Sequence, residues 1–131
     1  MSQTTLADET ESFATQEAIA TTLQRYVDGA RNGDTRLLRS AFAPGARVSG
    51  SYGGTSVTWT LQEFCDAVEK GGPAADLKTR VVAIEYRGTA AMARLEAENW
   101  RGTRYTDFFV LVVRDNVWRI ASKVFFSHRR A

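Results

Sequence analysis

The hydrophobic pattern of the chain changes its period near residue 78, and this change limits the fold more than any other feature. Beyond it, apolar residues such as Val82, Ile84 and Tyr86 alternate with more polar neighbours, as expected for half-buried strands. Turn-forming pairs recur about every 14 residues. They are Arg87-Gly88, Arg101-Gly102 and Asp115-Asn116. The pattern predicts an antiparallel meander of four long strands, over 78–87, 90–100, 103–114 and 117–128.

The preceding part of the chain has helical periodicity instead. Apolar spacing predicts a first amphipathic helix over about 15–31, which Asn32-Gly33 would end in a left-handed cap. Asp34 is a suitable N-cap for a second helix, which Pro44-Gly45 would stop. The apolar faces would be Ile19, Leu23, Tyr26, Val27 and Ala30 in the first helix and Leu37, Leu38, Ala41 and Phe42 in the second.

Extended structure and a third helix follow. Residues 46–59 have an extended pattern that Gly53-Gly54 interrupts, which predicts two short strands or a strand and a loop. Thr60 and Glu63 match the capping box, in which each side chain satisfies the other's free backbone N–H group, so a helix should begin here. Gly71-Gly72-Pro73 would close that helix. Its apolar face would be Leu61, Phe64, Cys65 and Val68.

Helices grouped before an antiparallel meander indicate an α+β fold. A long sheet twists, and with helices on one face it tends to curl around them. The space between the helices and the curved face is a natural pocket. The length of 131 residues suits one domain, which we place at 14–131, after a polar and flexible tail over 1–13.

Composition and charge argue against several functions. The net charge is +2 and the basic residues are scattered, so we expect no nucleic-acid binding. Cys65 is the only cysteine and His128 the only histidine, which excludes an internal disulfide and a histidine-based metal cluster. No phosphate-binding loop is visible, and we expect no cofactor. No apolar run reaches the ~18 residues of a spanning helix, and Met1–Thr5 do not resemble a signal peptide, so we expect a cytoplasmic protein without membrane association.

Two stretches of the first half match known motifs. One is Arg25-Tyr26-Val27-Asp28-Gly29 through Gly33-Asp34, and the other is Leu37-Leu38 through Phe42-Ala43-Pro44-Gly45-Ala46. They resemble the opening helix and the Leu…Phe-His-Pro-Asp-Ala stretch of small bacterial members of the nuclear-transport-factor-2-like (SnoaL-like) superfamily, with Ala43 where histidine is common. The resemblance covers residues 14–127. It implies a cone-shaped fold with N-terminal helices packed on a strongly curved antiparallel sheet.

Two later stretches narrow the resemblance to one branch. They are Tyr105-Thr106-Asp107-Phe108 and Trp118-Arg119-Ile120-Ala121-Ser122-Lys123-Val124-Phe125. They are most similar to the lumazine-binding branch, in which a Thr-Asp strand and a Trp-Lys-Ile…Asn-Lys-Val-Phe strand recur. Here Arg119 replaces Lys and Ser122 replaces Asn. The superfamily includes steroid isomerases, dehydratases, polyketide cyclases, binding proteins and adaptor domains, so the fold alone does not name the function.

Three functions are compatible with this resemblance. The first is a small-molecule-binding domain with an aromatic-lined pocket. The second is a cofactor-independent isomerase, dehydratase or cyclase, with Asp107 as acid/base and Tyr26 or Lys123 stabilising the developing oxyanion. The third is an interaction module that dimerises through its sheet. Where the steroid isomerases have a second carboxylate, this chain has Ala43-Pro44-Gly45, which favours the binding domain.

Asp107 is the strongest candidate for chemistry, because it lies in an apolar strand, where a carboxylate must be paired, solvated or neutral. Lys123 is on the neighbouring strand. A three-residue hairpin loop would place Asp107 opposite Lys123, whereas a two-residue loop would place it opposite Val124. If the two meet, Lys123 could hold a substrate carbonyl or carboxylate, form a structural ion pair, or form a Schiff base through a lowered pKa.

Aromatic residues are the remaining candidates. Tyr26 lies on the core-facing stripe of the first helix, where the steroid isomerases have a tyrosine that donates into the cavity, or it is a core residue. Side chains that could wall a cavity for an apolar or aromatic ligand, or form ordinary core, are Trp59, Phe64, Trp100, Tyr105, Phe109 and Phe125. Val110 and Val112 alternate with other apolar residues, so both sheet faces are apolar and we expect a homodimer through the sheet.

Overall fold

The structure, a computed structural model, describes the backbone of residues 2–128 and the side chains of residues 13–128. Within these residues it contains three helices and six strands. In chain order they are α1 (Ser2–Asn32), α2 (Thr35–Ser40), β1 (Phe42–Tyr52), β2 (Thr55–Thr60), α3 (Leu61–Gly71), β3 (Lys78–Arg87), β4 (Ala90–Trp100), β5 (Thr103–Arg114) and β6 (Val117–His128). The predicted α+β class is confirmed.

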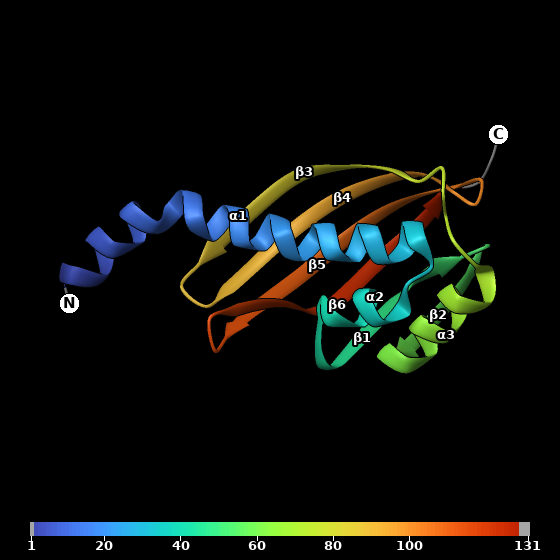
Figure 1. Cartoon of the computed structure of the whole chain (residues 1–131), viewed down its shortest axis with the longest axis horizontal. Helices are drawn as coiled ribbons and strands as arrows, with labels where there is room; N and C mark the ends of the chain where they lie inside the picture. The colour runs from blue at the N-terminus through green and yellow to red at the C-terminus, as the bar shows by residue number, and fades with distance from the viewer. Residues whose placement is uncertain (1, 129–131) are drawn as a thin grey trace.

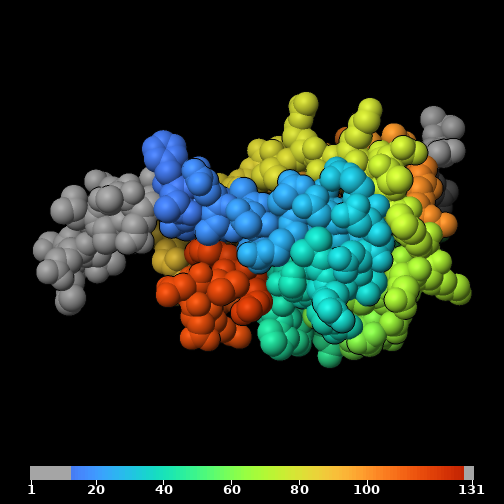
Figure 2. Space-filling model, viewed as in Figure 1, coloured from blue at the N-terminus to red at the C-terminus, as the bar shows by residue number. Residues whose placement is uncertain are grey.

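The strands of the described residues form one sheet, in the order β2-β1-β6-β5-β4-β3. Neighbouring strands are antiparallel except β1 and β6, which run parallel, so the sheet is mixed. The sheet curves, and α1 lies along its concave face with α2 beside it, while α3 lies near β1 and β2 (Figure 1). In the space-filling view these helices cover much of the sheet from this side (Figure 2).

The meander is confirmed with the predicted boundaries, since β3, β4, β5 and β6 begin and end at the predicted residues. Its turns contain residues with positive φ, as tight hairpin turns require. These residues are Gly88, Arg101, Gly102, Asp115 and Asn116, with φ between 52° and 88°. The first turn lies one residue later than the predicted Arg87-Gly88, because Arg87 still pairs with Ala90.

The second helix ends earlier than predicted. α2 stops at Ser40, and Phe42 begins β1 instead of extending the apolar face of α2. Pairing with β6 explains the difference, since the Ile120 N–H group donates to the Ala41 carbonyl at 2.8 Å and Ile120 pairs with Phe42. Pro44-Gly45 therefore lies inside a strand, where the β1–β6 register is irregular. An irregular strand tolerates proline because the missing N–H group is not needed for the ladder.

The predicted helix ends are otherwise present. Asp34 accepts a hydrogen bond from the Leu37 N–H group at 3.1 Å and caps α2. Thr60 and Glu63 form both hydrogen bonds of the capping box at the start of α3. Helix α1 begins at Ser2 rather than near residue 15. The tail predicted over 1–13 lies, except for its last residue, outside the described side chains.

The core lies between the helices and the concave face of the sheet. The predicted apolar face of α1 is fully buried there. Gly29 allows α2 to approach α1 closely, because a Cβ atom at this position would lie 2.6 Å from the backbone nitrogen of Leu38. Gly50 allows β1 and β6 to lie equally close within the sheet, because a Cβ atom at this position would lie 2.1 Å from the carbonyl oxygen of Phe125.

The opposite face of the sheet is apolar and exposed. Five side chains of β4, β5 and β6, which we call the outer apolar patch, are 39–52% exposed: Met92, Phe108, Val110, Val124 and Phe126. They are neighbours, because Met92 pairs with Val110 and Phe108 pairs with Val124. The apolar alternation on both sheet faces therefore leaves an apolar surface across three strands, with Arg94 over the Phe108 ring and His128 beside Phe126 at its edge.

Candidate functional site

The β5–β6 hairpin decides where the predicted site residues point. Its turn is the two-residue Asp115-Asn116, the shorter of the two predicted loops. That register alone would place Asp107 opposite Val124. The register shifts by one residue at Ala121, however, which is the extra residue of a β-bulge. Asp107 therefore pairs with Phe125, which neither predicted register gave.

The bulge also turns Lys123 toward the inner face of the sheet. Before it, Trp118 and Ile120 are the buried residues of β6, and after it Lys123, Phe125 and Ser127 are. Lys123 pairs with Phe109, which lies two residues from Asp107 on β5. The two charged side chains are thus diagonal neighbours on one face, within reach of each other.

Three buried polar side chains meet at this point, and we call them the buried triad: Tyr26, Asp107 and Lys123. The Lys123 amine donates a hydrogen bond to the Tyr26 hydroxyl. That hydroxyl donates to the Asp107 carboxylate at 3.5 Å. The Lys123 amine lies 3.8 Å from the other carboxylate oxygen, Oδ1, which has no hydrogen-bond partner among the described residues. Their exposed fractions are 0% for Tyr26 and Asp107 and 3% for Lys123.

Aromatic rings enclose the Lys123 amine. Among the described side chains, the ring centroids of Tyr26, Phe64, Trp100 and Phe125 lie 4.6–5.4 Å from its nitrogen. The rings come from α1, α3, β4 and β6, so the cage exists only in the folded chain. Ring faces attract a cation, and the same rings exclude water from the amine.

Burial shifts the protonation of all three groups toward their neutral forms. It raises the pKa of Asp107, although the Lys123 charge and the Tyr26 hydrogen bond act in the opposite direction. It lowers the pKa of Lys123, which the Asp107 charge opposes. It raises the pKa of Tyr26 well above its ordinary value, and the Asp107 charge adds to this rise. The three groups therefore share their protons away from bulk solvent. A small change in the surrounding charge or hydrogen bonding can shift a proton from one of them to another.

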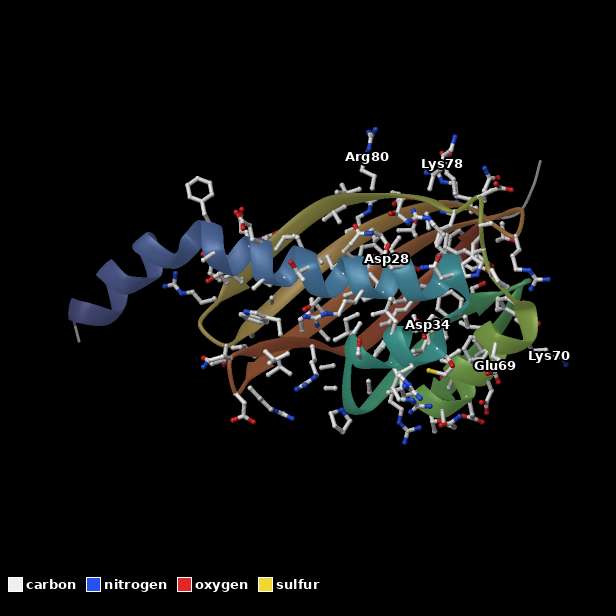
Figure 3. All side chains as sticks on the ribbon, viewed as in Figure 1. Asp28, Asp34, Glu69, Lys70, Lys78 and Arg80 are labelled. Carbon is white, nitrogen blue, oxygen red and sulfur yellow. The ribbon has the colours of Figure 1, made fainter. Side chains whose placement is uncertain are left out.

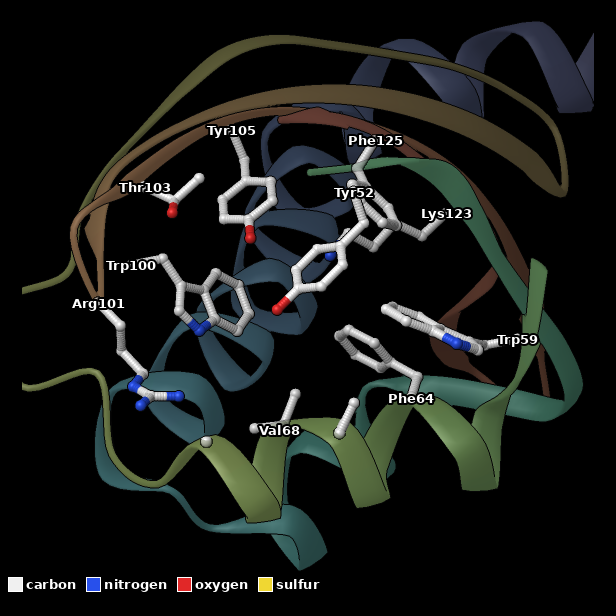
Figure 4. Close-up of a pocket in the computed structure, with 12 residues that line it drawn as sticks. Tyr52, Trp59, Phe64, Val68, Trp100, Arg101, Thr103, Tyr105, Lys123 and Phe125 are labelled. Carbon is white, nitrogen blue, oxygen red and sulfur yellow. The ribbon is translucent and has the colours of Figure 1, made fainter. Parts of the chain in front are cut away.

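A cavity of about 300 Å³ opens beside the triad, at the lower end of the size range of ligand sites. Lys123 is the member of the triad that lines it, and its amine points toward the middle of the ring cluster (Figure 4). Tyr52, Trp59, Trp100 and Tyr105 form much of the wall, and Phe64 and Val68 of α3 lie opposite them (Figure 4). The remaining lining residues are Ala67, Gly71, Arg101, Thr103 and Phe125.

Polar groups also contribute to the cavity wall. The hydroxyls of Tyr52 and Tyr105 point into the space (Figure 4). Burial raises the pKa of Tyr105 to about 12, so at neutral pH this hydroxyl remains protonated and can donate a hydrogen bond. Arg101 lies at the edge of the cavity (Figure 4) and is exposed to solvent. The wall therefore combines aromatic ring faces with hydroxyl, amine and guanidinium groups, which can donate hydrogen bonds to an acceptor in the cavity.

The predicted ligand residues are divided by the structure. Trp59, Phe64, Trp100, Tyr105 and Phe125 line the cavity. Phe109 does not, because it lies beneath Tyr26 in the core, with ring centroids 5.2 Å apart and 1% exposure. The prediction also omitted Tyr52 and Arg101. Each of them directly precedes a glycine of a turn, Gly53-Gly54 for Tyr52 and Gly102 for Arg101. These turns, at the ends of strands, are the signal that could have pointed to the mouth of the cavity.

Other candidate groups lie away from the cavity. Cys65 is buried on α3, and burial raises the pKa of its thiol. The His128 ring nitrogen Nε2 lies 2.9 Å from the Thr106 hydroxyl, which also donates to Glu96. Across the described residues, no group of three or more His, Cys, Asp or Glu side chains could hold a metal ion. No helix in that part of the chain is long and apolar enough to cross a membrane.

Comparison with known proteins identifies relatives along most of the chain. The family described as "Putative lumazine-binding" matches residues 14–126. Aldolase FrzH from Cladobotryum sp is 27% identical over 115 residues, which are 87% of this chain and 92% of that protein. Two solved NTF2-like proteins of unknown function are also similar. The one from Shewanella baltica is 28% identical with a TM-score of 0.85, over 90% of this chain and 97% of its own. The one from Methylobacillus flagellatus is 31% identical with a TM-score of 0.85, over 88% and 94%.

Proposed function

Since the chain belongs to the Putative lumazine-binding family of the nuclear-transport-factor-2-like superfamily, we propose that it binds a flat carbonyl compound in its aromatic cavity and moves a proton on it. The reaction would be of the aldol or isomerisation type and would need no cofactor. One observation carries this proposal: a buried triad of acid, hydroxyl and amine lies at the inner end of the cavity. A cavity that served binding alone would not need a carboxylate and an amine buried away from solvent beside it.

The triad offers the two tasks that carbonyl chemistry requires. A group must stabilise the oxygen that gains negative charge, and a group must accept or return a proton. Lys123 lines the cavity, so it is the member that would touch the substrate and the catalytic residue of the proposal. Asp107 does not line the cavity, so it would act through Lys123 and Tyr26, as a positioning residue and proton reservoir.

The named relative supports chemistry over simple binding. The similarity to Aldolase FrzH extends over 87% of this chain and 92% of that protein. Aldol additions and isomerisations both pass through an enol or enolate next to a carbonyl. The same triad can therefore support either reaction, and the cavity walls would select the substrate.

A fluorogenic retro-aldol assay tests the proposal. The probe is a β-hydroxyketone carrying a naphthyl ring, whose cleavage releases a fluorescent naphthaldehyde and a small ketone. We expect turnover above the buffer rate, and a loss of about 100-fold in Lys123→Met. Lys78→Met is the matched control, because Lys78 is an exposed lysine on β3 and should keep full activity.

Two results would contradict the proposal. The first is equal activity of the wild type and Lys123→Met, which would reject Lys123 as the catalytic residue. The second is micromolar binding of the naphthaldehyde product, measured by calorimetry, together with no turnover of several β-hydroxyketones. That second result would leave a small-molecule-binding domain as the function.

We also propose that a second copy of the chain covers the outer apolar patch. The patch is continuous across three strands. Beside it lie both signs of charge, in the ion pairs of Glu96 with Arg94 and Arg104. A face that carries an apolar centre and both charges can be complementary to itself in a twofold dimer.

Sedimentation velocity at micromolar concentration tests this interface. We expect a dimer for the wild type and a monomer for Val124→Asp, which puts a carboxylate in the middle of the patch. Val82→Asp is the matched control, since Val82 is exposed to a similar degree but lies on β3, outside the patch. A monomeric wild type would reject the dimer.

A further inference from the structure

The three lysines of the chain have different surroundings. Lys70 and Lys78 are exposed and project away from the body of the protein (Figure 3). Lys123 is 3% exposed, and the little surface it keeps faces the cavity. A molecule in the cavity would therefore meet this amine.

The surroundings of the Lys123 amine do not suit a permanent ammonium ion. An ammonium has three protons to donate. Among the described residues, the acceptors near this nitrogen are the Tyr26 hydroxyl and, 3.8 Å away, the Asp107 carboxylate. A buried ion pair stabilises a protein only when its hydrogen bonds are well formed, and the carboxylate oxygen nearest the amine forms none with the described residues.

The groups around the amine do suit one that reacts as a nucleophile. A neutral amine is the reactive form, and burial moves the pKa of Lys123 in the direction that supplies it. The Tyr26 hydroxyl touches the nitrogen and Asp107 lies behind it, so a proton donor and a proton acceptor are already in place. The surrounding ring faces can stabilise any cation that forms at this nitrogen.

We propose that Lys123 forms a covalent Schiff base with the carbonyl carbon of an aldehyde or ketone substrate. This proposal rests on the proposed function and specifies its substrate class. Carboxylic acids are excluded as substrates, because they do not form an imine with an amine under these conditions. Esters are excluded because attack by the amine would leave a stable amide and block the enzyme.

The side chains of the buried triad supply every proton that the reaction needs. The Lys123 nitrogen forms a bond to the carbonyl carbon, and the π electrons of the carbonyl move to its oxygen. The oxygen takes a proton from the Tyr26 hydroxyl, and the proton that the nitrogen gives up restores that hydroxyl. Asp107, which holds a proton while Lys123 is a neutral amine, supplies a second proton through Tyr26; the carbon–oxygen bond breaks, water leaves, and an iminium ion forms beside the Asp107 carboxylate. That carboxylate then accepts a proton, either from the carbon next to the iminium carbon or from a β-hydroxyl group as the bond between the α and β carbons breaks and an aldehyde leaves. The product is an enamine, and return of the proton to its carbon followed by addition of water regenerates the amine and the carbonyl.

The test uses pentane-2,4-dione, a small 1,3-diketone. A reactive amine condenses with it, loses one water and forms a stable enaminone that absorbs in the near ultraviolet. We expect the absorption to appear with the wild type at neutral pH. Peptide mass mapping should find the adduct, diketone minus water, on Lys123 roughly tenfold or more faster than on Lys70 or Lys78, because Lys123 has a proton-transferring hydroxyl beside its amine and burial lowers its pKa.

The exposed lysines serve as internal controls, so the central result needs no variant. Lys123→Met should lose the absorption, while its melting temperature shows whether it is folded. Asp107→Asn and Tyr26→Phe should keep Lys123 but slow its labelling even at high pH, where the amine is neutral in every variant. A purely structural role for these residues would leave that rate unchanged. Labelling of Lys70 or Lys78 ahead of Lys123 in the wild type would overturn the proposal.

The outcome separates this inference from the proposed function. Retro-aldol turnover without any adduct on Lys123 would mean that the chemistry is non-covalent, so the Schiff base would be rejected and the proposed function kept. An adduct together with turnover supports both. Absence of the adduct and of turnover would reject both.

Discussion

Replacement of Lys123 by methionine should destabilise the protein strongly, although methionine fits the same space. The change leaves the Asp107 carboxylate buried at 0% exposure without the amine that faces it. Removal of one partner of a buried pair costs about 3–5 kcal/mol. We expect the lower end of that range, about 3 kcal/mol, because Asp107 can take up a proton. In a domain of this size that corresponds to a decrease of roughly 12 °C in melting temperature.

A double-mutant cycle measures this coupling. The double variant Lys123→Met with Asp107→Leu removes both buried polar groups, so its free energy of unfolding should return to within about 1 kcal/mol of the wild type. Urea unfolding followed by tryptophan fluorescence gives the four values. Lys78→Met should change the free energy by less than about 0.5 kcal/mol. If the double variant is as unstable as the sum of the single ones, the two side chains do not interact and our description of the triad is wrong.

The pH dependence of Lys123→Met gives a second check on the same variant. Without the amine, burial raises the pKa of Asp107 above its value in the unfolded chain, and the Tyr26 hydroxyl is the neighbour that still faces the carboxylate. A raised pKa in the folded state stabilises the fold at low pH, and this stabilisation is lost as the pH rises through the folded-state pKa. The cost of Lys123→Met should therefore be smaller at about pH 5 than at about pH 8. An equal cost at both pH values would show that Asp107 does not change protonation.

Three further predictions concern the fold and the cavity. Gly29→Ala should cost about 2 kcal/mol or more, because its Cβ atom would lie 2.6 Å from the Leu38 backbone nitrogen; an unchanged melting temperature would contradict the close approach of α1 and α2. Thr60→Ala should cost about 1 kcal/mol by removing the cap of α3, and Thr60→Ser should restore most of it. Ala67→Trp places a large ring in the cavity from an exposed position of α3. It should weaken binding of a naphthyl ketone about tenfold or more, measured by calorimetry, without lowering the melting temperature, and unchanged affinity would place the ligand elsewhere.

Local features of the sequence were sufficient to predict the meander and the start of α3. Alternating apolar residues and turn pairs act over a few neighbours, so they mark the ends of β3 to β6 correctly. The capping box at Thr60 and Glu63 is likewise a contact between residues three apart. Where a distant strand competes, local reasoning fails: Phe42 continues the helical pattern of α2 but pairs with Ile120 instead.

The site itself depended on tertiary structure. The sequence identifies Tyr26, Asp107 and Lys123 as unusual. It also gives the possible lengths of the turn between β5 and β6, but the turn fixes the strand register only for the residues close to it. The bulge at Ala121 then exchanges which residues of β6 face inward. A bulge forms where packing on both sides of the sheet makes the exchange favourable, and that packing involves helices and strands far away in the chain. For this reason the residue types of the site can be read from the chain, whereas their meeting at one end of a cavity is a property of the folded molecule.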